Sequence, residues 1–298
     1  MQYKKPGKSD LEISRIGFGC MSLKNGENAN IRLLHSALCK GINYFDTADI
    51  YDKGANETLV GKAFQGKRDK VVLATKVGNV WKKDGSGLDW NPSGQHILQS
   101  VEHSLRRLRT DYIDLYQLHG GTIEDNMEET VEAFELLKKQ GKIRYYGISS
   151  IRPNVIGQYV KHSNIVSLMV QYSLLDRRPE ETLLPLMQED DIGIVVRGSL
   201  ASGLLVDKSA REYLGHTVQE VQQIQKTVQA LTNAHRNTAA VAIQYVLQHT
   251  SVTSAVVGVR TEQQLEDALA AIDATPLSQE EYQLLQNKIP AQMYGQHR

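Results

Sequence analysis

Residues 113–148 read IDLYQLHGGTIEDNMEETVEAFELLKKQGKIRYYGI, and they contain the unit from which most of the chain is built. The apolar runs Ile113–Leu118 and Ile143–Ile148 are predicted to be strands. Between them, residues 128–140 have the apolar spacing of an amphipathic helix that ends before Gly141. Two strands joined through a helix run parallel in one sheet. The stretch therefore predicts a β-α-β unit.

The same alternation of strand and helix extends in both directions and predicts eight strands, each followed by a helical pattern. Eight such units in about 250 residues fit an α/β fold of the (β/α)8 TIM barrel class better than an open doubly wound sheet. The phosphate fingerprint of the open sheet, G-x-G-x-x-G, is missing after the first strand. The predicted strands are Arg15–Gly19, Asn43–Asp46, Val71–Thr75, Ile113–Leu118, Ile143–Ile148, Val166–Gln171, Ile192–Val196 and Ser254–Val257.

Two helices, near 238–249 and 278–287, are predicted to be additional to the eight units. The chain has no internal repeat, low-complexity tract or linker rich in proline and serine. We therefore expect residues 1–298 to form a single barrel domain.

Composition narrows the functional classes. The chain has 34 basic and 34 acidic side chains, so no overall field would attract nucleic acid or an acidic membrane surface. Cys20 and Cys39 are the only cysteines, which argues against a disulfide scaffold or a cysteine-rich zinc site, and no metal is expected. The amino terminus leads into no apolar signal segment. We expect a cytoplasmic protein whose partner is a small molecule.

Four chemically active side chains follow consecutive predicted strands. Asp46 and Lys76 end the second and third strands, His119 follows the fourth, and Tyr51 lies in the loop after Asp46. Each alone has an ordinary explanation as a turn cap, a solvated lysine, a structural histidine or a loop residue. In a barrel, however, the carboxyl ends of the strands form one mouth, where active sites lie. The sequence therefore predicts that the four groups converge there.

Together these groups could donate a proton to a carbonyl oxygen. A phenol is a poor acid at neutral pH, but an ammonium within a few ångströms stabilises the phenolate, so Lys76 would make Tyr51 a usable acid. Asp46 would compensate the buried ammonium, and His119 would orient the substrate oxygen. Such a site supplies no electrons, so a reduction would need a hydride from a bound nicotinamide.

Five motifs in this order and spacing resemble those of the aldo-keto reductases over nearly the whole chain. They are DTADIYDKGANE, ATK at the end of a strand, DYIDLYQLH, KIRYYGIS and VVGVRTEQQLEDALAAI. The resemblance implies a (β/α)8 barrel that reduces aldehydes and ketones with NADPH or, less often, NADH. It also implies that Asp46, Tyr51, Lys76 and His119 are the catalytic tetrad, with Tyr51 as the general acid. The chain resembles the general-purpose bacterial members rather than a substrate-specialised branch.

The resemblance further implies which residues hold the nicotinamide end of the cofactor. Ser149 and Gln171 match the holders of the carboxamide, and Ser150 stands beside them where the family more often has asparagine. Arg197 takes the place of an aromatic residue that commonly stacks on the nicotinamide, and a guanidinium can also stack on a ring. An ion pair inside the barrel is the alternative role for Arg197. Gly198, Ser199 and Leu200 stand where the family commonly has Ser-Pro-Leu, and Leu200–Leu205, which includes Gly203, matches the loop that runs along the pyrophosphate.

The eighth unit carries a physical signal for phosphate. Thr261 and Gln264 are spaced as a capping box at the start of a helix, and helix amino termini attract phosphate. Gly258 lets a phosphate approach the backbone closely, and the guanidinium of Arg260 could bind a 2′-phosphate through two hydrogen bonds. We therefore expect NADPH rather than NADH. An ordinary helix cap beside a solvated arginine is the plainer alternative. By resemblance Gln264 and Asp267 also contact the cofactor, whereas Ala268 replaces an asparagine often directed at adenine.

Substrate contacts and rival functions are less constrained by the sequence. Met21 and Trp81, with Trp90 as a further candidate, lie in loops that could line a pocket for an aldehyde or ketone, or could simply pack. One rival is a noncatalytic barrel that binds a nicotinamide nucleotide as a sensor or accessory subunit. A second is a phosphate-binding isomerase or aldolase, which would use a Schiff-base lysine or a carboxylate pair and no nicotinamide.

Overall fold

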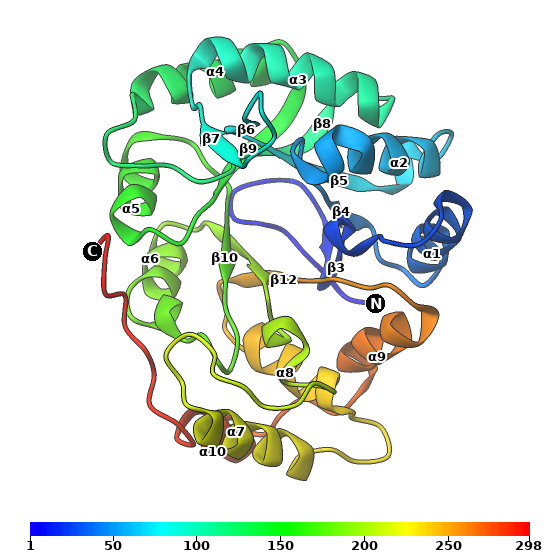
Figure 1. The fold of residues 1–298 in the computed structure, drawn as a ribbon, viewed down its shortest axis with the longest axis vertical. Helices are drawn as coiled ribbons and strands as arrows, with labels where there is room; N and C mark the ends of the chain where they lie inside the picture. Colours follow the sequence, from blue (N-terminus) through cyan, green and yellow to red (C-terminus); the bar gives the residue numbers. More distant parts are fainter.

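Eight parallel strands close into one barrel, which confirms the predicted fold class (Figure 1). The computed structural model describes all 298 residues. Neighbours along the chain also pair in space, and the last barrel strand closes the barrel against the first. The barrel strands are β3 (Ile16–Gly19), β4 (Tyr44–Asp46), β5 (Val72–Val77), β8 (Ile113–Leu118), β9 (Ile143–Ser149), β10 (Ser167–Gln171), β11 (Gly193–Arg197) and β12 (Val252–Val257).

Helices surround the barrel, and their ends follow the signals in the sequence. Ser93 accepts a hydrogen bond from the amide of His96 at the start of α3, and Ser278 forms a reciprocal capping box with Glu281 at α10. The helices are α1 (Glu27–Cys39), α2 (Ala55–Ala63), α3 (Gly94–Leu108), α4 (Met127–Lys139), α5 (Pro153–His162), α6 (Leu183–Glu189), α7 (Val218–Ala230), α8 (Thr238–Leu247), α9 (Glu262–Asp273) and α10 (Gln279–Gln286).

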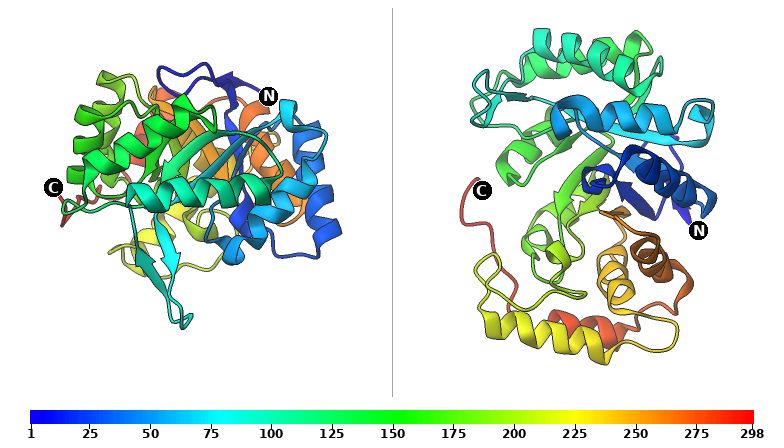
Figure 2. Two further views of the ribbon diagram at one scale, coloured as in Figure 1. Left: turned by 90° about the horizontal axis from the view of Figure 1, so that it is seen from above. Right: turned by 45° about the vertical axis from the view of Figure 1, so that its right-hand side comes forward.

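Two helices are additional to the eight units, but one of them is not where the sequence placed it. Both α7 and α8 lie between β11 and β12. Residues 239–246 of α8 are all buried, and α8 packs against β12 and α9, so it occupies the helix ring. The outer helix is α7, which lies alongside α10 (Figures 1 and 2). The prediction that 238–249 is the additional helix was therefore wrong, because apolar residues on all sides of α8 require burial.

The barrel has a core of its own, separate from the layer between strands and helices. Its residues come from alternate positions of the strands, as in Tyr44, Ala74 and Leu115. Leu11 and Ile13 belong to the same cluster, because the hairpin of β1 (Tyr3–Lys4) and β2 (Ile13–Ser14) covers the amino end of the barrel. The inside of the barrel is thus filled at that end and leaves only the opposite mouth for chemistry.

A second hairpin leaves the barrel at the mouth. It consists of β6 (Asn79–Trp81) and β7 (Leu88–Trp90), pairs antiparallel and directly follows β5. Figure 2 shows it projecting from the body of the molecule. None of the helices in the structure has both the length and the apolar character that crossing a bilayer requires.

Candidate active site

Side-chain alternation along the strands directs polar residues into the mouth of the barrel. Tyr44, Ala74 and Leu115 belong to the inner core of β4, β5 and β8. Two positions further on, where the same face recurs, the strands carry Asp46, Lys76 and Gln117. The polar side chains therefore form a layer above the apolar filling, at the carboxyl end of the strands.

Asp46 and Lys76 form a buried ion pair, which confirms the predicted pairing. The Nζ atom of Lys76 lies 2.6 Å from Oδ2 of Asp46 and donates a second hydrogen bond of 2.6 Å to the carbonyl of Thr47. Lys76 is 1% exposed and Asp46 is 5% exposed. Burial disfavours both charges and raises the pKa of Asp46, but this carboxylate, aided by the phenol of Tyr51, still keeps the pKa of Lys76 above its ordinary value. Lys76 is therefore an ammonium at neutral pH.

Tyr51 and His119 lie beside this pair. The ammonium of Lys76 is 5.2 Å from the centroid of the Tyr51 ring, and the rings of Tyr51 and His119 meet edge to face with centroids 6.1 Å apart. Burial, together with Lys76 and Arg197, lowers the pKa of His119 to about 3. The imidazole is neutral at physiological pH, and its Nδ1 atom is buried without a hydrogen-bond partner. The structure thus brings together all four residues that the sequence placed at the mouth.

Two further polar residues at the mouth were missed by the sequence analysis. Gln117 is fully buried, and its Nε2 atom donates to Oδ1 of Asp46 over 3.4 Å. Asp49, two residues before Tyr51, has a buried Oδ1 atom without a partner, and burial together with Glu57 raises its pKa to about 7. The signal for Gln117 was present, since it is an uncharged polar residue within an apolar strand, two positions before His119.

An ion pair between Glu57 and Arg107 packs against the end of the segment that carries Tyr51. Glu57 of α2 is 0% exposed and accepts hydrogen bonds of 2.6 Å from Nε of Arg107 and from the hydroxyl of Thr75. The side chain of Arg107 runs beneath Gly54, where an added Cβ would lie 2.9 Å from its Cδ. This cluster connects α2, α3 and β5, and Thr75 is the neighbour of Lys76.

The residues predicted to hold the nicotinamide lie on the other half of the same mouth. Ser149 ends β9 and Ser150 follows it, both 7% exposed, and Ser150 accepts from the amide of Arg152. Gln171 and Arg197 pair across β10 and β11, and the guanidinium donates to Oε1 of Gln171 over 2.8 Å. Arg197 is exposed and its guanidinium bonds the Gln171 carboxamide rather than a carboxylate, so it does not form the ion pair inside the barrel that was its alternative role.

The predicted cofactor residues Gly198 and Ser199 follow β11 directly, and the predicted pyrophosphate loop begins at Leu200. Gly198 and Gly203 have positive φ values of 73° and 91°, which glycine adopts without strain. Ser199 is buried and its hydroxyl has no partner, while Leu200 packs partly buried against the core. An unpaired buried hydroxyl beside a glycine turn suits a polar ligand group such as a phosphate.

The predicted phosphate site after β12 is built from a loop and the start of α9. Gly258 approaches Ser22 so closely that an added Cβ would collide with it. Thr261 caps α9 by accepting from the amide of Gln264. The other half of the predicted capping box is wrong, because Oε1 of Gln264 accepts from the amide of Arg260 at 2.9 Å instead. The Gln264 carboxamide therefore fixes the backbone of the loop that precedes α9.

The side chains of this loop and of the start of α9 differ in how free they are to bind a ligand. The guanidinium of Arg260 is exposed and makes no hydrogen bond or ion pair, while its carbonyl accepts from Asn25 at 2.8 Å. Asp267 accepts from Gln263 at 2.9 Å and from Asn237 at 3.4 Å. Arg260 is thus free to meet an anion, whereas the Asp267 carboxylate already has partners within its own surroundings.

Of the predicted substrate contacts, Met21 is 57% exposed and Trp81 is 38% exposed. Met21 lies just after β3, and Trp81 lies on β6, where its indole N–H donates to the carbonyl of Ile50 at 3.0 Å. Both residues follow barrel strands on the side where the four polar residues lie.

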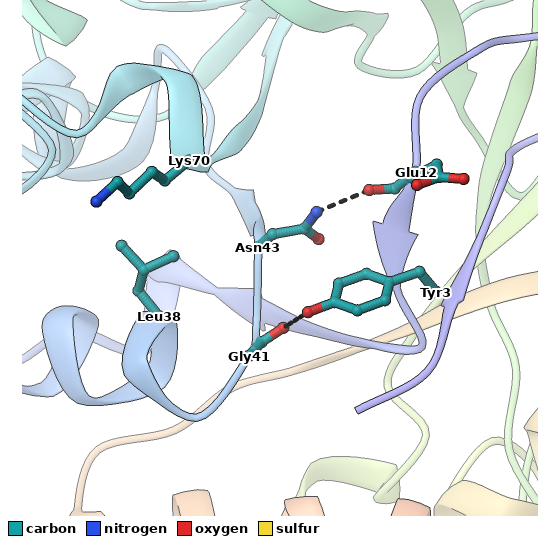
Figure 3. A pocket seen from close by; sticks show the side chains of 6 residues that line it. All are labelled: Tyr3, Glu12, Leu38, Gly41, Asn43 and Lys70. Atoms are coloured by element: carbon teal, nitrogen blue, oxygen red, sulfur yellow. Dashed lines mark hydrogen bonds between the residues drawn. The ribbon is translucent and has the colours of Figure 1, made fainter.

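A cavity of about 300 Å³ lies at the opposite end of the barrel, beside the amino ends of β4 and β5 (Figure 3). Its wall is held by hydrogen bonds from Tyr3 to the carbonyl of Gly41 and from Asn43 to the carbonyl of Glu12. The cavity contains none of the predicted site residues. In barrels this face serves stability, so the cavity is no candidate active site. The lining residues are Tyr3, Glu12, Leu38, Gly41, Asn43 and Lys70.

Comparison with known proteins agrees with this geometry. The model of the aldo/keto reductase family matches residues 15–290. An uncharacterised oxidoreductase of Bacillus subtilis, YqkF, is 48% identical over the full length of both chains. The NADH-specific methylglyoxal reductase of Escherichia coli is 34% identical over 70% of this chain and 70% of its own.

Solved structures agree as well. The holo form of aldo-keto reductase AKR11C1 from Bacillus halodurans superposes with a TM-score of 0.95 at 48% identity, covering 100% of this chain and 99% of the other. The apo form of the same enzyme gives a TM-score of 0.86. With the closed barrel and the four polar residues at its mouth, the family match across nearly the whole chain makes this protein a member of the aldo/keto reductase family of nicotinamide-dependent oxidoreductases.

Proposed function

We propose that the protein reduces aldehydes and ketones to alcohols with NADPH, and that Tyr51 is the general acid. The observation that carries the proposal is the buried ammonium of Lys76, which is paired with Asp46 and lies 5.2 Å from the Tyr51 ring. A buried charge is stable only when an opposite charge compensates it. Here Asp46 compensates the Lys76 ammonium, which still lies next to the phenol of Tyr51. This arrangement serves proton transfer rather than packing.

In the proposed reaction, the Tyr51 hydroxyl gives its proton to the substrate oxygen as that oxygen gains negative charge. The Lys76 ammonium stabilises the phenolate that remains, and Asp46 keeps the ammonium in place. His119 is neutral, so it can hydrogen-bond the substrate oxygen without adding a second positive charge beside Lys76. Met21 and Trp81 are the proposed walls of the substrate pocket.

A reduced nicotinamide supplies the hydride when it is bound. We assign its carboxamide to Ser149, Ser150 and Gln171, and one face of its ring to Arg197. Gly198 and Ser199 would also contact the cofactor, and the loop 200–205 would follow the pyrophosphate. The loop 258–261 and the first turns of α9, including Gln264 and Asp267, would hold the adenosine end. The backbone as a whole superposes more closely on the holo form of the relative, with a TM-score of 0.95, than on its apo form, with 0.86, which supports a cofactor site on this barrel.

NADPH is the proposed cofactor because Arg260 is exposed and has no partner of its own. Asn25 fixes the carbonyl of Arg260 and Gln264 fixes its amide, so the backbone is held while the guanidinium remains free. A fork of this kind suits the 2′-phosphate that distinguishes NADPH from NADH.

The test begins with binding and turnover of the unaltered protein. NADPH should quench the fluorescence of Trp81 and Trp90, and its nicotinamide absorbance should fall when a panel of aldehydes is added. Binding without turnover on any carbonyl would instead identify a noncatalytic nucleotide-binding barrel. An isomerase or aldolase would show neither signal.

The substitution Tyr51→Phe should then abolish most of the turnover. A general acid contributes roughly 10²- to 10⁴-fold, so kcat should fall by that factor while the NADPH dissociation constant changes little. Tyr3→Phe is the matched control, since the Tyr3 hydroxyl bonds the carbonyl of Gly41 at the opposite end of the barrel. Retention of most of the rate by Tyr51→Phe would refute the assignment of the general acid.

A further inference from the structure

The β6–β7 hairpin lies between the two segments that carry Tyr51 and His119. It leaves the barrel directly after β5, whose neighbours in the barrel are β4 and β8. Tyr51 follows β4 and His119 follows β8. The hairpin can therefore contact both segments, and it does so through separate residues.

The contact on the Tyr51 side is made by Trp81. Its indole N–H donates to the carbonyl of Ile50 at 3.0 Å, and the ammonium of Lys53 lies 5.4 Å from the centroid of its ring. Ile50 precedes Tyr51 and Lys53 follows it by two residues. One side chain of the hairpin thus contacts the chain on both sides of the phenol.

This segment has a backbone that needs outside support. Asp52 and Lys53 have φ values of 50° and 54°, in the left-handed region that residues with a Cβ rarely occupy. Such a conformation persists only when the surrounding structure holds it. Trp81 supplies part of that support through the carbonyl of Ile50, and the side chain of Arg107, paired with Glu57, packs against Gly54 at the end of the segment.

The contact on the His119 side is made by Asn79 and Trp90. The Nδ2 atom of Asn79 donates to the carbonyl of His119 at 2.6 Å. The indole N–H of Trp90 donates to both carboxylate oxygens of Asp125, at 2.9 and 3.0 Å. The ring of Trp90 also lies against Gly120, where an added Cβ would be 3.1 Å from it. The second segment is therefore fastened to the same hairpin.

We propose that the β6–β7 hairpin is a clamp that fixes Tyr51 and His119 relative to each other, and that Trp81 and Asn79 are its two positioning residues. The proposal rests on the proposed carbonyl reduction, in which the phenol and the imidazole must reach one substrate oxygen. Small misplacements of reacting groups lower the rate of the chemical step more than they weaken binding. The clamp should therefore act on kcat.

The kinetic test compares Trp81→Phe and Asn79→Ala with the parent enzyme. Each substitution removes one hydrogen bond from one side of the clamp, so kcat should fall roughly 2- to 10-fold. In Asn79→Ala, which alters no proposed wall of the substrate pocket, the KM of each aldehyde should stay within about twofold, and the NADPH dissociation constant should do so in both variants. Asp89→Asn is the matched control, because Asp89 lies on the same hairpin, exposed, and only forms an exposed ion pair with Lys82 at 3.8 Å. It should leave kcat unchanged.

Hydrogen exchange gives a readout that does not depend on turnover. In Trp81→Phe, the amides of residues 50–54 should exchange faster, while those of residues 119–125 keep the parent rate. Asn79→Ala should show the reverse pattern. A substitution that merely loosened the hairpin would accelerate exchange within residues 79–90 and leave both flanking segments unchanged, which would overturn the proposal.

Two kinetic outcomes would also overturn it. Parent values of kcat in both variants would show that the contacts do not position the site. A change confined to KM, and different for each aldehyde, would show that Trp81 is a wall of the substrate pocket only. If the parent protein reduces no carbonyl compound, the proposed function fails, whereas the exchange measurements still decide whether the hairpin holds the two segments.

Discussion

At the scale of single residues, Lys76 is the group whose surroundings constrain the site most. An ammonium that is 1% exposed is stable only with a compensating charge, and Asp46 is the carboxylate paired with it. Gln117 and the carbonyl of Thr47 complete the hydrogen bonds of the pair. The same contacts that stabilise the barrel therefore also hold the proposed proton-transfer site.

Replacing Lys76 by methionine should affect activity and stability together. The substitution leaves Asp46 buried without its partner, so the free energy of unfolding should fall by about 3 to 5 kcal/mol. Urea unfolding measures this loss, and turnover should disappear in the same variant. The control Lys70→Met removes an exposed lysine and should change neither quantity. An inactive Lys76→Met protein with parent stability would contradict the role given to the ion pair.

Asp49 gives a prediction about pH. Burial and Glu57 raise its pKa to about 7, while Arg107 and Lys76 oppose this rise. The folded state therefore binds a proton that the unfolded state releases near pH 4, so this group's contribution to stability is present at low pH and is lost as pH rises to about 7. The slope is at most about 1.4 kcal/mol for each pH unit.

Asp49→Asn should consequently be more stable than the parent at pH 8 and close to it at pH 4. Urea unfolding at the two pH values provides the measurement, and Asp111→Asn, at an exposed position, is the control. Equal effects of Asp49→Asn at both values would mean that Asp49 does not titrate in this range.

At the scale of elements, the loop before α9 determines the expected cofactor preference. A charge-assisted hydrogen bond from Arg260 to a partly exposed 2′-phosphate is worth about 1.5 to 3 kcal/mol, or roughly 10- to 150-fold in affinity. Arg260→Ala should weaken NADPH binding by that factor and barely affect NADH. Arg32→Ala, which removes an exposed arginine on α1, controls for net charge. Equal weakening of both nucleotides would show that Arg260 supports the fold or the shared pyrophosphate.

At the scale of the whole molecule, the barrel depends on the seam where its last strand meets its first. Arg15, just before β3, crosses this seam and donates to the carbonyls of Val252, Thr253 and Leu247. Arg15→Met should lower the free energy of unfolding by about 1.5 to 3 kcal/mol, because carbonyl groups lose a charged donor. The kcat value should not change, since the seam contact lies at the amino end of β12, away from the mouth.

The measurement is urea unfolding alongside turnover, with Arg32→Met as the control for a lost surface arginine. A stability loss accompanied by a matching loss of kcat would show that the seam and the mouth are coupled. Unchanged stability would show that the paired strands close the barrel without this side chain.

Much of this protein was determined by its sequence alone, for a local reason. Alternation between short apolar runs and amphipathic helices depends on residues close together in the chain, and it predicted every end of the barrel strands to within two residues. Since all parallel strands end at one mouth, the positions of Asp46, Lys76 and His119 at strand ends were enough to predict that they meet.

Tertiary structure decided the features that depend on partners far along the chain. Only packing shows that α8 enters the helix ring, that Gln264 braces Arg260, and that Trp81 bonds the carbonyl of Ile50. The support of Glu57 by Arg107 joins residues 50 positions apart. No periodic pattern encodes such contacts, because which side chains meet across two elements depends on how the whole barrel twists and closes.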